Sequence, residues 1–324
     1  MKNGHSVYIA YAKEGDLGKL LNENVKKYIL KSNSSLLSSI QLFFHLLFSK
    51  YDIIHAHMYW AFKVSGIAGK LTGHKIVYNE HGLGMWRKWY HRLIIRFLSR
   101  FSNKIITSCY ECKYYREIRD KIKPNKLQTL YNSFTRDEHE VTSEIVSNLE
   151  KKDFMIGYVG RFNKVKRLEI FIEIASELIG KIDNFKIILV GDGPERVLIE
   201  NLIQKNNLEQ FFYLPGFCDE SLKYYKNFDI FILPSKREAF SIALLEAGAS
   251  TLPAIAFDVG GNSEIITNKK TGYLIQDGMI GELVEKIIYL YQNPYIKIEM
   301  GQNAKKYISE NFSIKKRINK LEKL

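Results

Sequence analysis

Short runs of strand-forming residues alternate with amphipathic helical patterns along the whole chain of 324 residues. In the first half, strands are expected over residues 7–10, 53–56, 75–78, 104–108 and 127–131. In the second half, they are expected over residues 154–159, 186–190, 211–214, 230–233, 254–257 and 273–275. This alternation of strands and helices is typical of α/β proteins with parallel sheets.

The length of the chain corresponds to two domains of ordinary size. Residues 135–153 are polar and lack a strand pattern, so they predict the connection between the domains. We therefore expect an N-terminal domain over residues 1–140 and a C-terminal domain over residues 151–295. A basic helical segment over residues 296–324 closes the chain and could pack back on the N-terminal domain. Doubly wound domains of this kind bind ligands beyond the carboxyl ends of their strands.

The composition, with 46% hydrophobic and 26% charged residues, excludes a disordered chain and a collagen-like repeat. Cys109, Cys112 and Cys218 are too few for a disulfide framework and fit a reducing cytoplasm. The first residues are polar, so we expect no secretory leader. The longest apolar run, residues 36–48, is too short to span a bilayer and predicts a core helix.

Basic residues are concentrated in the first half of the chain. The net charge is +13, and residues 1–150 carry +10 of it, with 23 basic and 13 acidic residues. Residues 84–126 alone hold 12 basic and 3 acidic residues. The partner that this charge attracts is therefore expected to bind the N-terminal half. Nucleic acid is not the expected partner, because no known RNA- or DNA-binding module accompanies the charge.

One expected helix, over residues 87–101, carries much of this charge. Four cations align on it at a spacing of four residues: Lys88, Arg92, Arg96 and Arg100. Apolar side chains lie on the adjacent faces: Leu93, Ile94 and Phe97. The pattern fits a helix that rests on an anionic membrane surface. It also fits a core helix with a solvated basic face.

In the second half, three motifs follow strands. Gly160-Arg161-Phe162 follows the first strand, with Lys166 five residues beyond Arg161, and two cations near a helix start suit a diphosphate. A solvated basic loop is the alternative. Gly191-Asp192-Gly193-Pro194 follows the next strand and is equally compatible with a simple tight turn.

The third motif, residues 234–242, follows the strand over residues 230–233. Glu238 lies on its loop, and Glu246 lies eight residues later on the helix that follows. Ionised carboxylates accept strong hydrogen bonds from sugar and ribose hydroxyls. Two solvated glutamates are the alternative. A further glycine turn, Gly260-Gly261, again lies between a strand and a helix and is followed by Glu264.

Together these motifs resemble the donor domain of retaining glycosyltransferase family 4, whose members have the GT-B fold. The matches occur in family order between residues 160 and 264: Gly160-Arg161, Lys166, Gly191-Asp192-Gly193-Pro194, Pro234-Ser235, Glu238, Glu246, Ala249, Pro253, Gly260-Gly261 and Glu264. The first half matches more loosely, at Gly4-His5-Ser6-Val7, residues 52–57, His81-Gly82, Thr107-Ser108 and Tyr131-Asn132. The resemblance implies two doubly wound, Rossmann-like domains that face each other across a cleft.

The resemblance also implies how a nucleotide sugar, most simply a UDP-sugar, would be held. Arg161 and Lys166 would stabilise the leaving diphosphate, a form of electrostatic preorganisation. The backbone amides of residues 240–242, which are Phe240, Ser241 and Ile242, would bind the same group. The catalytic Glu238 would bind the sugar hydroxyls. Three further residues would contact the ribose or the base: Glu246, Gly216 and Phe217.

On the acceptor side, the resemblance makes His81 a catalytic residue near the reacting centre and places His57 nearby. A structural histidine is the alternative for each. A metal site at His55 and His57 is not expected, because no further ligand cluster accompanies them. The chain also contains no Asp-x-Asp motif, so we expect transfer that needs neither a metal ion nor a cofactor.

The chain departs from the family pattern at three glycines and at its start. Arg167, Ser241 and Thr251 stand where the family usually has glycine. Ser241 is a mild change if it begins a helix, and Thr251 could narrow the site. Family members also have a strand, a glycine-rich loop and a helix before the G-H-x-V stretch with which this chain begins. We therefore expect exposed strand edges, and either a natural start further upstream or an unstable or inactive form.

The function expected from these features is that of a hexosyltransferase in the biosynthesis of surface polysaccharide or lipopolysaccharide. It would move a sugar, with retention, from a nucleotide sugar to a glycan or lipid-linked acceptor. We expect it in the cytoplasm, peripheral on the inner face of the plasma membrane. The alternative is a GT-B partner protein that binds a nucleotide sugar or glycan without turnover. A nicotinamide-dependent enzyme is disfavoured because the chain lacks G-x-G-x-x-G.

Overall fold

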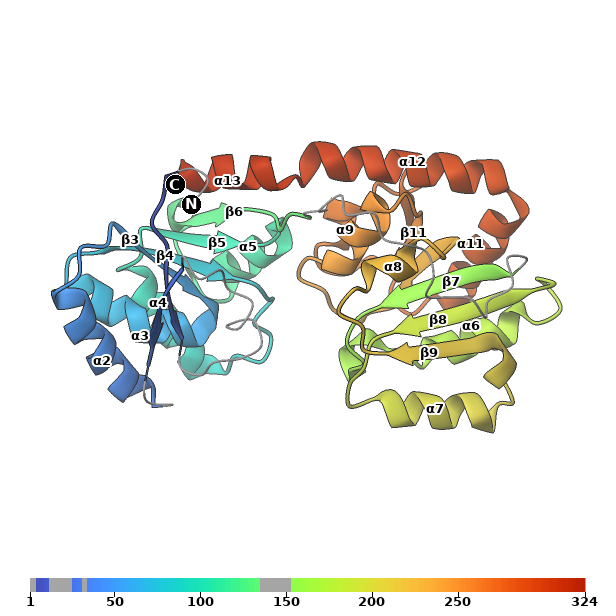
Figure 1. Cartoon of the computed structure of the whole chain (residues 1–324), viewed down its shortest axis with the longest axis horizontal. Helices are drawn as coiled ribbons and strands as arrows, with labels where there is room; N and C mark the ends of the chain where they lie inside the picture. The colour runs from blue at the N-terminus through green and yellow to red at the C-terminus, as the bar shows by residue number, and fades with distance from the viewer. Residues whose placement is uncertain (1–3, 12–24, 31–33, 135–152, 324) are drawn as a thin grey trace. The chain divides into compact units, whose positions relative to one another are not determined.

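A computed structural model describes residues 4–11, 25–30, 34–134 and 153–323 of the chain (Figure 1). It divides into two compact units. Unit 1 comprises Met1–Thr107 and Lys113–Thr129, and unit 2 comprises Ser108–Cys112 and Leu130–Leu324. The expected connection over residues 135–153 lies outside the described residues, apart from Asp153, so the predicted domain limits stay predictions.

Unit 1 contains six described strands: β1 (Tyr8–Tyr11), β2 (Lys26–Ile29), β3 (Ile53–His57), β4 (Lys75–Glu80), β5 (Lys104–Thr107) and β6 (Leu127–Thr129). Its helices are α2 (Ser35–Leu47), α3 (Met58–Leu71), α4 (Trp89–Ser99) and, shared with unit 2 at its start, α5 (Tyr110–Ile118). A 3-10 turn, η1 (Pro124–Lys126), precedes β6.

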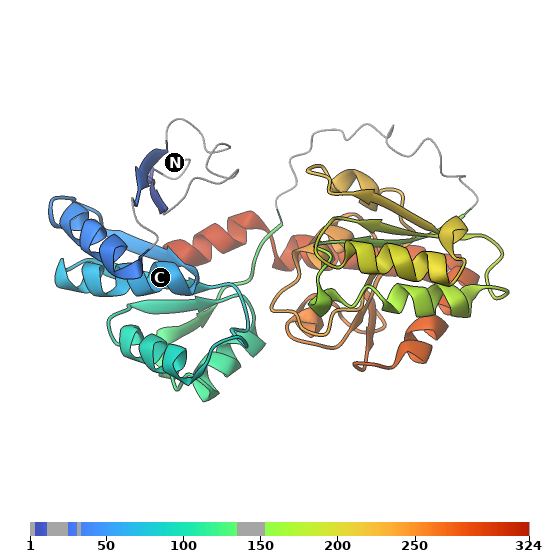
Figure 2. The ribbon, with the colours of Figure 1, turned by 90° about the horizontal axis from the view of Figure 1, so that it is seen from below.

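The strands of unit 1 form two parallel sheets. One has the order β3-β4-β5-β6, so β3 is an edge strand of this sheet. The other consists of β1 and β2 alone, a pair visible in dark blue in Figure 2. The sequence did not predict β2, because the segment Lys26–Ile29 has only two apolar residues beside two lysines. It also did not predict that β1 pairs outside the larger sheet.

The core of unit 1 lies between the larger sheet and helices α3 and α4. Phe62 of α3 stacks on Tyr78 of β4, with ring centroids 4.2 Å apart, and both rings are fully buried. Ile95 and Leu98 attach α4 to the same core, while Leu93 and Phe97 on this helix are exposed. The helix is therefore both a core helix and an amphipathic surface helix.

Unit 2 contains six described strands: β7 (Phe154–Val159), β8 (Phe185–Val190), β9 (Phe212–Gly216), β10 (Ile230–Leu233), β11 (Ala254–Phe257) and β12 (Gly272–Ile275). Its α-helices are α6 (Ile170–Leu178), α7 (Arg196–Lys205), α8 (Leu222–Tyr225), α9 (Ile242–Ala249), α10 (Asn262–Ile265), α11 (Ile280–Gln292), α12 (Pro294–Asn311) and α13 (Ile314–Glu322). Two 3-10 turns are also present, η3 (Lys164–Lys166) and η4 (Glu209–Phe211).

These strands form one parallel sheet with the order β12-β11-β10-β7-β8-β9. The chain builds outward in one direction from β7 and then in the other direction from β10, which is the doubly wound arrangement. β7, β10 and β11 are buried along their whole length, as expected for a sheet covered on both faces. α11 packs on α6, and α12 packs on α9 (Figure 1). The α/β class with parallel sheets is thus confirmed.

The helical segment expected over residues 296–324 is two helices, not one. The chain leaves α12 after Asn311, and Ser313 caps α13 by accepting a hydrogen bond from Lys316 N at 3.4 Å. Helical periodicity alone missed this break, although a serine is a common residue at such a start. None of the helices in the described ranges is long and apolar enough to cross a membrane.

Candidate functional site

Two of the expected site residues, Lys166 and Glu238, meet at the carboxyl ends of neighbouring strands. Lys166 lies in η3 after β7, and Glu238 lies in the loop after β10. Lys166 Nζ is 2.5 Å from Glu238 Oε1, and both side chains are largely buried. Because β7 and β10 are the strands at which the winding direction reverses, this ion pair lies where doubly wound domains bind ligands. The expected helix start is further away, since α6 begins only at Ile170.

The Gly260-Gly261 turn explains how the Glu238 loop keeps its place. A side chain at Gly260 would collide with the backbone carbonyl of Glu238, and Gly260 has a φ of +60°. Gly261 N donates to Ala239 O at 3.0 Å. Lys236 N donates to Val165 O at 2.8 Å, which ties the same loop to η3. The backbone around Glu238 is therefore held from both neighbouring loops.

Arg161 and Phe217, expected at the diphosphate and the base, line one hollow of about 390 Å³. Asp192, from the Gly191-Asp192-Gly193-Pro194 loop, lines it too, and Asp192 O accepts a hydrogen bond from Phe162 N at 2.8 Å. Phe217 follows Gly216 at the end of β9, and 73% of its surface is exposed. An exposed aromatic ring beside a cation offers a flat apolar surface and a positive charge to one ligand.

The N-terminus of α9 presents the expected backbone amides. Ser241 is its N-cap and accepts a hydrogen bond from Leu244 N at 3.3 Å, so serine in place of glycine is mild, as expected. The amides at the start of a helix have no acceptor within the helix and carry a partial positive charge. Ile242, the first helical residue, is 42% exposed. This end of α9 can therefore bind an anion.

The side chain of Phe240 packs into an aromatic cluster with Tyr131 and Phe312. It stacks on Tyr131, with ring centroids 5.1 Å apart, and lies 5.4 Å from the ring of Phe312. Tyr131 was expected only as part of a family motif, and its contact with Phe240 was not predicted. Phe240, which precedes the N-cap of α9, is thus held by Tyr131 and by Phe312, the residue between α12 and α13.

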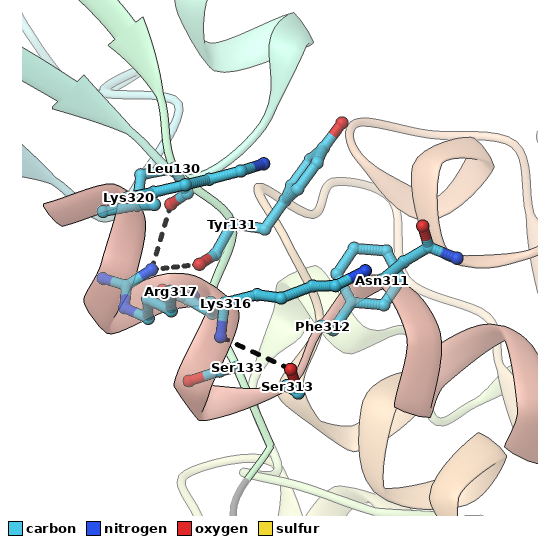
Figure 3. A pocket seen from close by; sticks show the side chains of 10 residues that line it. Leu130, Tyr131, Ser133, Asn311, Phe312, Ser313, Lys316, Arg317 and Lys320 are labelled. Carbon is cyan, nitrogen blue, oxygen red and sulfur yellow. Dashed lines mark hydrogen bonds between the residues drawn. The ribbon is translucent and has the colours of Figure 1, made fainter. Parts of the chain in front are cut away.

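Figure 3 shows how α13 holds the segment around Tyr131. Arg317 donates to Leu130 O at 3.0 Å and also to Tyr131 O. Burial lowers the pKa of Arg317, and its hydrogen bonds go to backbone carbonyls. Lys316 and Lys320 line the same small pocket. All of these residues belong to unit 2.

Glu246, the expected ribose ligand, lies on α9 and is mostly buried. Tyr225 of α8 donates its hydroxyl to Glu246 Oε2 at 2.8 Å. Burial raises the pKa of Glu246 above its usual value, and the hydrogen bond from Tyr225 offsets only part of this rise. The sequence did not predict Tyr225, because the two residues lie 21 positions apart on different helices.

The other two glycine replacements occupy left-handed backbone positions. Arg167 has a φ of +50° and Thr251 a φ of +67°, a region that glycine adopts without strain. Arg167 also bonds to Pro234 O at 3.0 Å and pairs with Asp277. Thr251 follows the carboxyl end of α9, whereas Ser241 caps its opposite end. The expectation that Thr251 could narrow the site therefore stays a prediction.

In unit 1, His57 and His81 come together at the carboxyl ends of β3 and β4. His57 Nδ1 and His81 Nε2 are 2.9 Å apart, and the two rings are stacked. Asn79, the register partner of His57, donates its amide to the same His81 Nε2 at 2.9 Å. This nitrogen is therefore an acceptor, which leaves the proton of a neutral ring on Nδ1. Asn79 was not predicted, and its position two residues before His81 is the signal that could have found it.

Metal ligands do not cluster in the described part of the chain. It holds no group of three or more His, Cys, Asp or Glu side chains that could bind a metal ion. The positive charges at the candidate donor site are those of Arg161, Lys166 and the start of α9.

Residues 142–307 match the family model described as glycosyl transferases group 1. The chain belongs to this family. Residues 1–138 of this glycosyltransferase match the model of glycosyltransferase family 4, which confirms the family expected from the motifs.

Two curated relatives illustrate the range of this family. N-acetyl-alpha-D-glucosaminyl L-malate synthase of Bacillus anthracis is 31% identical over 214 residues, which are 64% of this chain and 55% of that protein. The chain thus spans little more than half of that relative. UDP-Gal:alpha-D-GlcNAc-diphosphoundecaprenol alpha-1,3-galactosyltransferase of Escherichia coli is 26% identical over 334 residues, covering 96% of this chain and 86% of that enzyme.

Among solved structures, HepE of Anabaena in complex with UDP superimposes with a TM-score of 0.87 at 20% identity. The match covers 98% of this chain and 90% of that one. The same protein has also been solved with UDP-glucose. This likeness concerns the fold and agrees with the GT-B class expected for the glycosyltransferase.

Proposed function

We propose that this glycosyltransferase moves a hexosyl group, with retention, from a UDP-sugar to a lipid-linked or glycan acceptor in bacterial polysaccharide biosynthesis. The observation that carries the proposal is the Lys166–Glu238 pair at the switch point of the unit 2 sheet. It combines a cation for a diphosphate with a carboxylate for sugar hydroxyls at the place where a doubly wound domain binds its ligand.

The donor class is supported by the shape of unit 2 and by the relatives. The hollow between Arg161 and Phe217 has a volume in the range of small-ligand sites. HepE, which shares the fold, was solved with UDP, and the Escherichia coli relative is named for a UDP-galactose donor. In this proposal Phe217 and Gly216 contact the base and Glu246 the ribose.

In the transfer step, the bond between the anomeric carbon and the diphosphate oxygen breaks. A bond forms between that carbon and the acceptor oxygen on the same face, and the proton of the acceptor hydroxyl passes to the departing diphosphate oxygen. Negative charge grows on the diphosphate, and in this proposal Lys166, Arg161 and the start of α9 stabilise it. Glu238 holds the sugar hydroxyls, and His81 lies on the acceptor side with His57. We propose that these cations serve the diphosphate without a metal ion.

The acceptor is proposed to be membrane-associated because of one surface of unit 1. Leu93 and Phe97 of α4 are exposed, and together with Ile67 of α3 they line a hollow of about 390 Å³. Arg96 on the same helix is exposed, and so is Arg100 at its end. Exposed apolar side chains beside cations suit the interface of an anionic membrane. The Escherichia coli relative is named for a diphosphoundecaprenol acceptor, which supports a lipid-linked substrate.

The first experiment measures donor turnover. Wild-type protein, Lys166→Ala and the exposed neighbour variant Lys164→Ala are incubated with UDP-, GDP- and ADP-sugars, with and without EDTA. We expect turnover of a UDP-sugar that survives EDTA, falls about 10²- to 10³-fold in Lys166→Ala and is unchanged in Lys164→Ala. UDP binding without turnover in a folded protein would favour the non-catalytic partner instead. Retention is tested by the anomeric NMR coupling of the product.

The second experiment measures sedimentation with anionic vesicles. A double variant, Arg96→Glu with Arg100→Glu, should lose vesicle binding, because each basic residue near such a surface contributes about 1 kcal/mol. Its control carries the same change of charge at exposed positions of unit 2, Lys205→Glu with Lys305→Glu. Equal binding by both double variants would contradict the proposed membrane surface.

A further inference from the structure

A cluster of four buried charges lies directly beneath the loop that carries His81. It consists of Glu80 at the end of β4, Arg87 before α4, and Arg116 and Asp120 in and after α5; we call it the charge cluster. Each of the four residues is no more than 3% exposed. Two cations face two anions, so the cluster is neutral when all four groups are ionised.

Glu80 fixes the chain on both sides of His81. It is the preceding residue in the sequence, and its Oε1 accepts a hydrogen bond from the following amide, Gly82 N, at 3.3 Å. Its Oε2 accepts from the Tyr78 hydroxyl at 2.8 Å and pairs with Arg87. Arg87 Nη2 also donates to the Tyr78 hydroxyl at 3.2 Å.

Arg116 holds the next part of the loop. Its Nη1 lies 2.5 Å from Asp120 Oδ2, and its Nη2 donates to Leu83 O. Asp120 Oδ2 also lies 3.4 Å from Arg87 Nη1, so this carboxylate joins the two guanidinium groups. Burial raises the pKa of Asp120 to about 6, while Arg87 lowers it.

Gly84 shows how closely the loop rests on the cluster. It has a φ of +63°, and a β-carbon there would lie 2.9 Å from both Arg116 Nη1 and Arg87 Nη1. The backbone of the loop therefore lies directly on the two guanidinium groups. The charge cluster thus holds the backbone on which His81 lies, and His57 and Asn79 contact its ring at Nε2.

Such a cluster is a poor source of stability. Removing four charges from water costs free energy that their attraction repays only partly, and hydrophobic residues of similar volume often serve equally well. Arg87 Nε and Arg116 Nε are buried without a hydrogen-bond partner among the described residues, which adds to this cost. What the cluster supplies is geometry, because each of its bonds to the loop is directional.

We propose that the charge cluster positions His81 for transfer, which makes its members positioning residues for the reaction. The inference rests on the proposed role of His81 on the acceptor side. It predicts that disturbing the cluster moves the His81 ring and slows the chemical step, while the donor, which binds to unit 2 residues, is held as before.

The test uses three variants of the full chain. Tyr78→Phe removes one hydroxyl of the network and keeps every charge, so it is the variant most certain to fold. Asp120→Asn removes the carboxylate that joins the two arginines. Leu127→Ala is the control, because it opens a cavity in the hydrophobic core of the same unit and removes none of the hydrogen bonds of the charge cluster.

Two readouts separate positioning from a structural role. Ring ¹⁵N chemical shifts of histidine-labelled protein, with His81 assigned from the spectrum of His81→Gln, report its tautomer and surroundings without any substrate. Steady-state kinetics report kcat and the KM for the donor. We expect Tyr78→Phe and Asp120→Asn each to shift the His81 resonances and to lower kcat about 10- to 100-fold, with a donor KM within about twofold of wild type.

The proposal is overturned if Tyr78→Phe and Asp120→Asn change the His81 resonances and kcat no more than Leu127→Ala does. If the wild-type protein turns over no nucleotide sugar, the proposed function fails, and the ring shifts still decide whether the cluster positions His81. If the wild-type protein is inactive but the two variants still shift the His81 resonances relative to it, the result supports the positioning role alone.

Discussion

The ammonium group of Lys166 lies 2.5 Å from the carboxylate of Glu238, although 72 residues separate them in the sequence. The pair is only partly exposed, with 22% of the lysine side chain and 10% of the glutamate side chain accessible. Each partner therefore holds the other at the end of its strand before any ligand arrives.

This pairing predicts non-additive stability. Lys166→Met and Glu238→Gln should each destabilise unit 2, and the double variant should lose less than the sum, with a coupling of about 0.5–3 kcal/mol. Each single change leaves one partner without its counter-charge, whereas the double change removes both. The measurement is chemical denaturation of all four proteins. Losses that add within about 0.5 kcal/mol would mean that the pair contributes nothing as a unit.

The Tyr225–Glu246 hydrogen bond predicts a pH-dependent donor affinity. Burial raises the pKa of Glu246 and Tyr225 lowers it, so Tyr225→Phe should raise it further. A protonated carboxyl accepts hydrogen bonds from ribose hydroxyls more weakly than a carboxylate does. UDP binding by the variant should therefore weaken more between pH 7.5 and pH 5.5 than UDP binding by wild type. Calorimetry at both pH values measures this. Phe228→Leu, a change to a nearby aromatic residue that does not bond Glu246, is the control.

The residues in left-handed backbone positions predict different effects of two changes to glycine. Thr251→Gly should raise the free energy of unfolding by about 1 kcal/mol, because a β-branched residue at a φ of +67° is strained. Arg167→Gly should not, since it also removes the bond to Pro234 O, the pair with Asp277 and the contact with the Phe257 ring. Thermal unfolding compares the two. A stabilised Arg167→Gly protein would show that these contacts contribute less than the backbone strain.

The aromatic cluster predicts a remote effect of α13 on donor binding. Phe312→Leu should weaken UDP binding several-fold, because the Phe312 ring packs against Phe240 and Tyr131 next to the α9 cap. Arg317→Ala should act in the same direction by releasing the Leu130 and Tyr131 carbonyls (Figure 3). Lys320→Ala changes a neighbouring side chain of the same pocket and serves as the control. If Phe312→Leu and Arg317→Ala bind UDP as tightly as Lys320→Ala does, the aromatic cluster does not affect donor binding.

Much of the fold could be predicted because strand and helix periodicities are local. The strands of unit 2 and the loops that follow them were found in this way, and a parallel sheet then brings the loop residues to one edge. β2 was missed because two of its four residues are lysines, and the break at Ser313 because periodicity continues across it. Pairing of β1 outside the main sheet left no local signal.

The candidate site could be predicted as a set of residues but not as a set of contacts. Lys166, Glu238 and His81 were identified from motifs, whereas Asn79, Tyr225 and the Phe240–Tyr131 stack depend on how distant segments pack. The charge cluster is the clearest case, since Glu80 and Asp120 lie 40 positions apart and each resembles an ordinary surface carboxylate in the sequence. Only tertiary structure shows that they share two arginines.

The contact between Gly260 and the Glu238 carbonyl has a consequence for interpreting natural variants. A single added methyl group at residue 260 would push against the backbone that carries the carboxylate, although 22 positions separate the two residues. A Gly260→Ala allele would then appear to affect only a distant turn, while it would in fact displace the loop that carries Glu238.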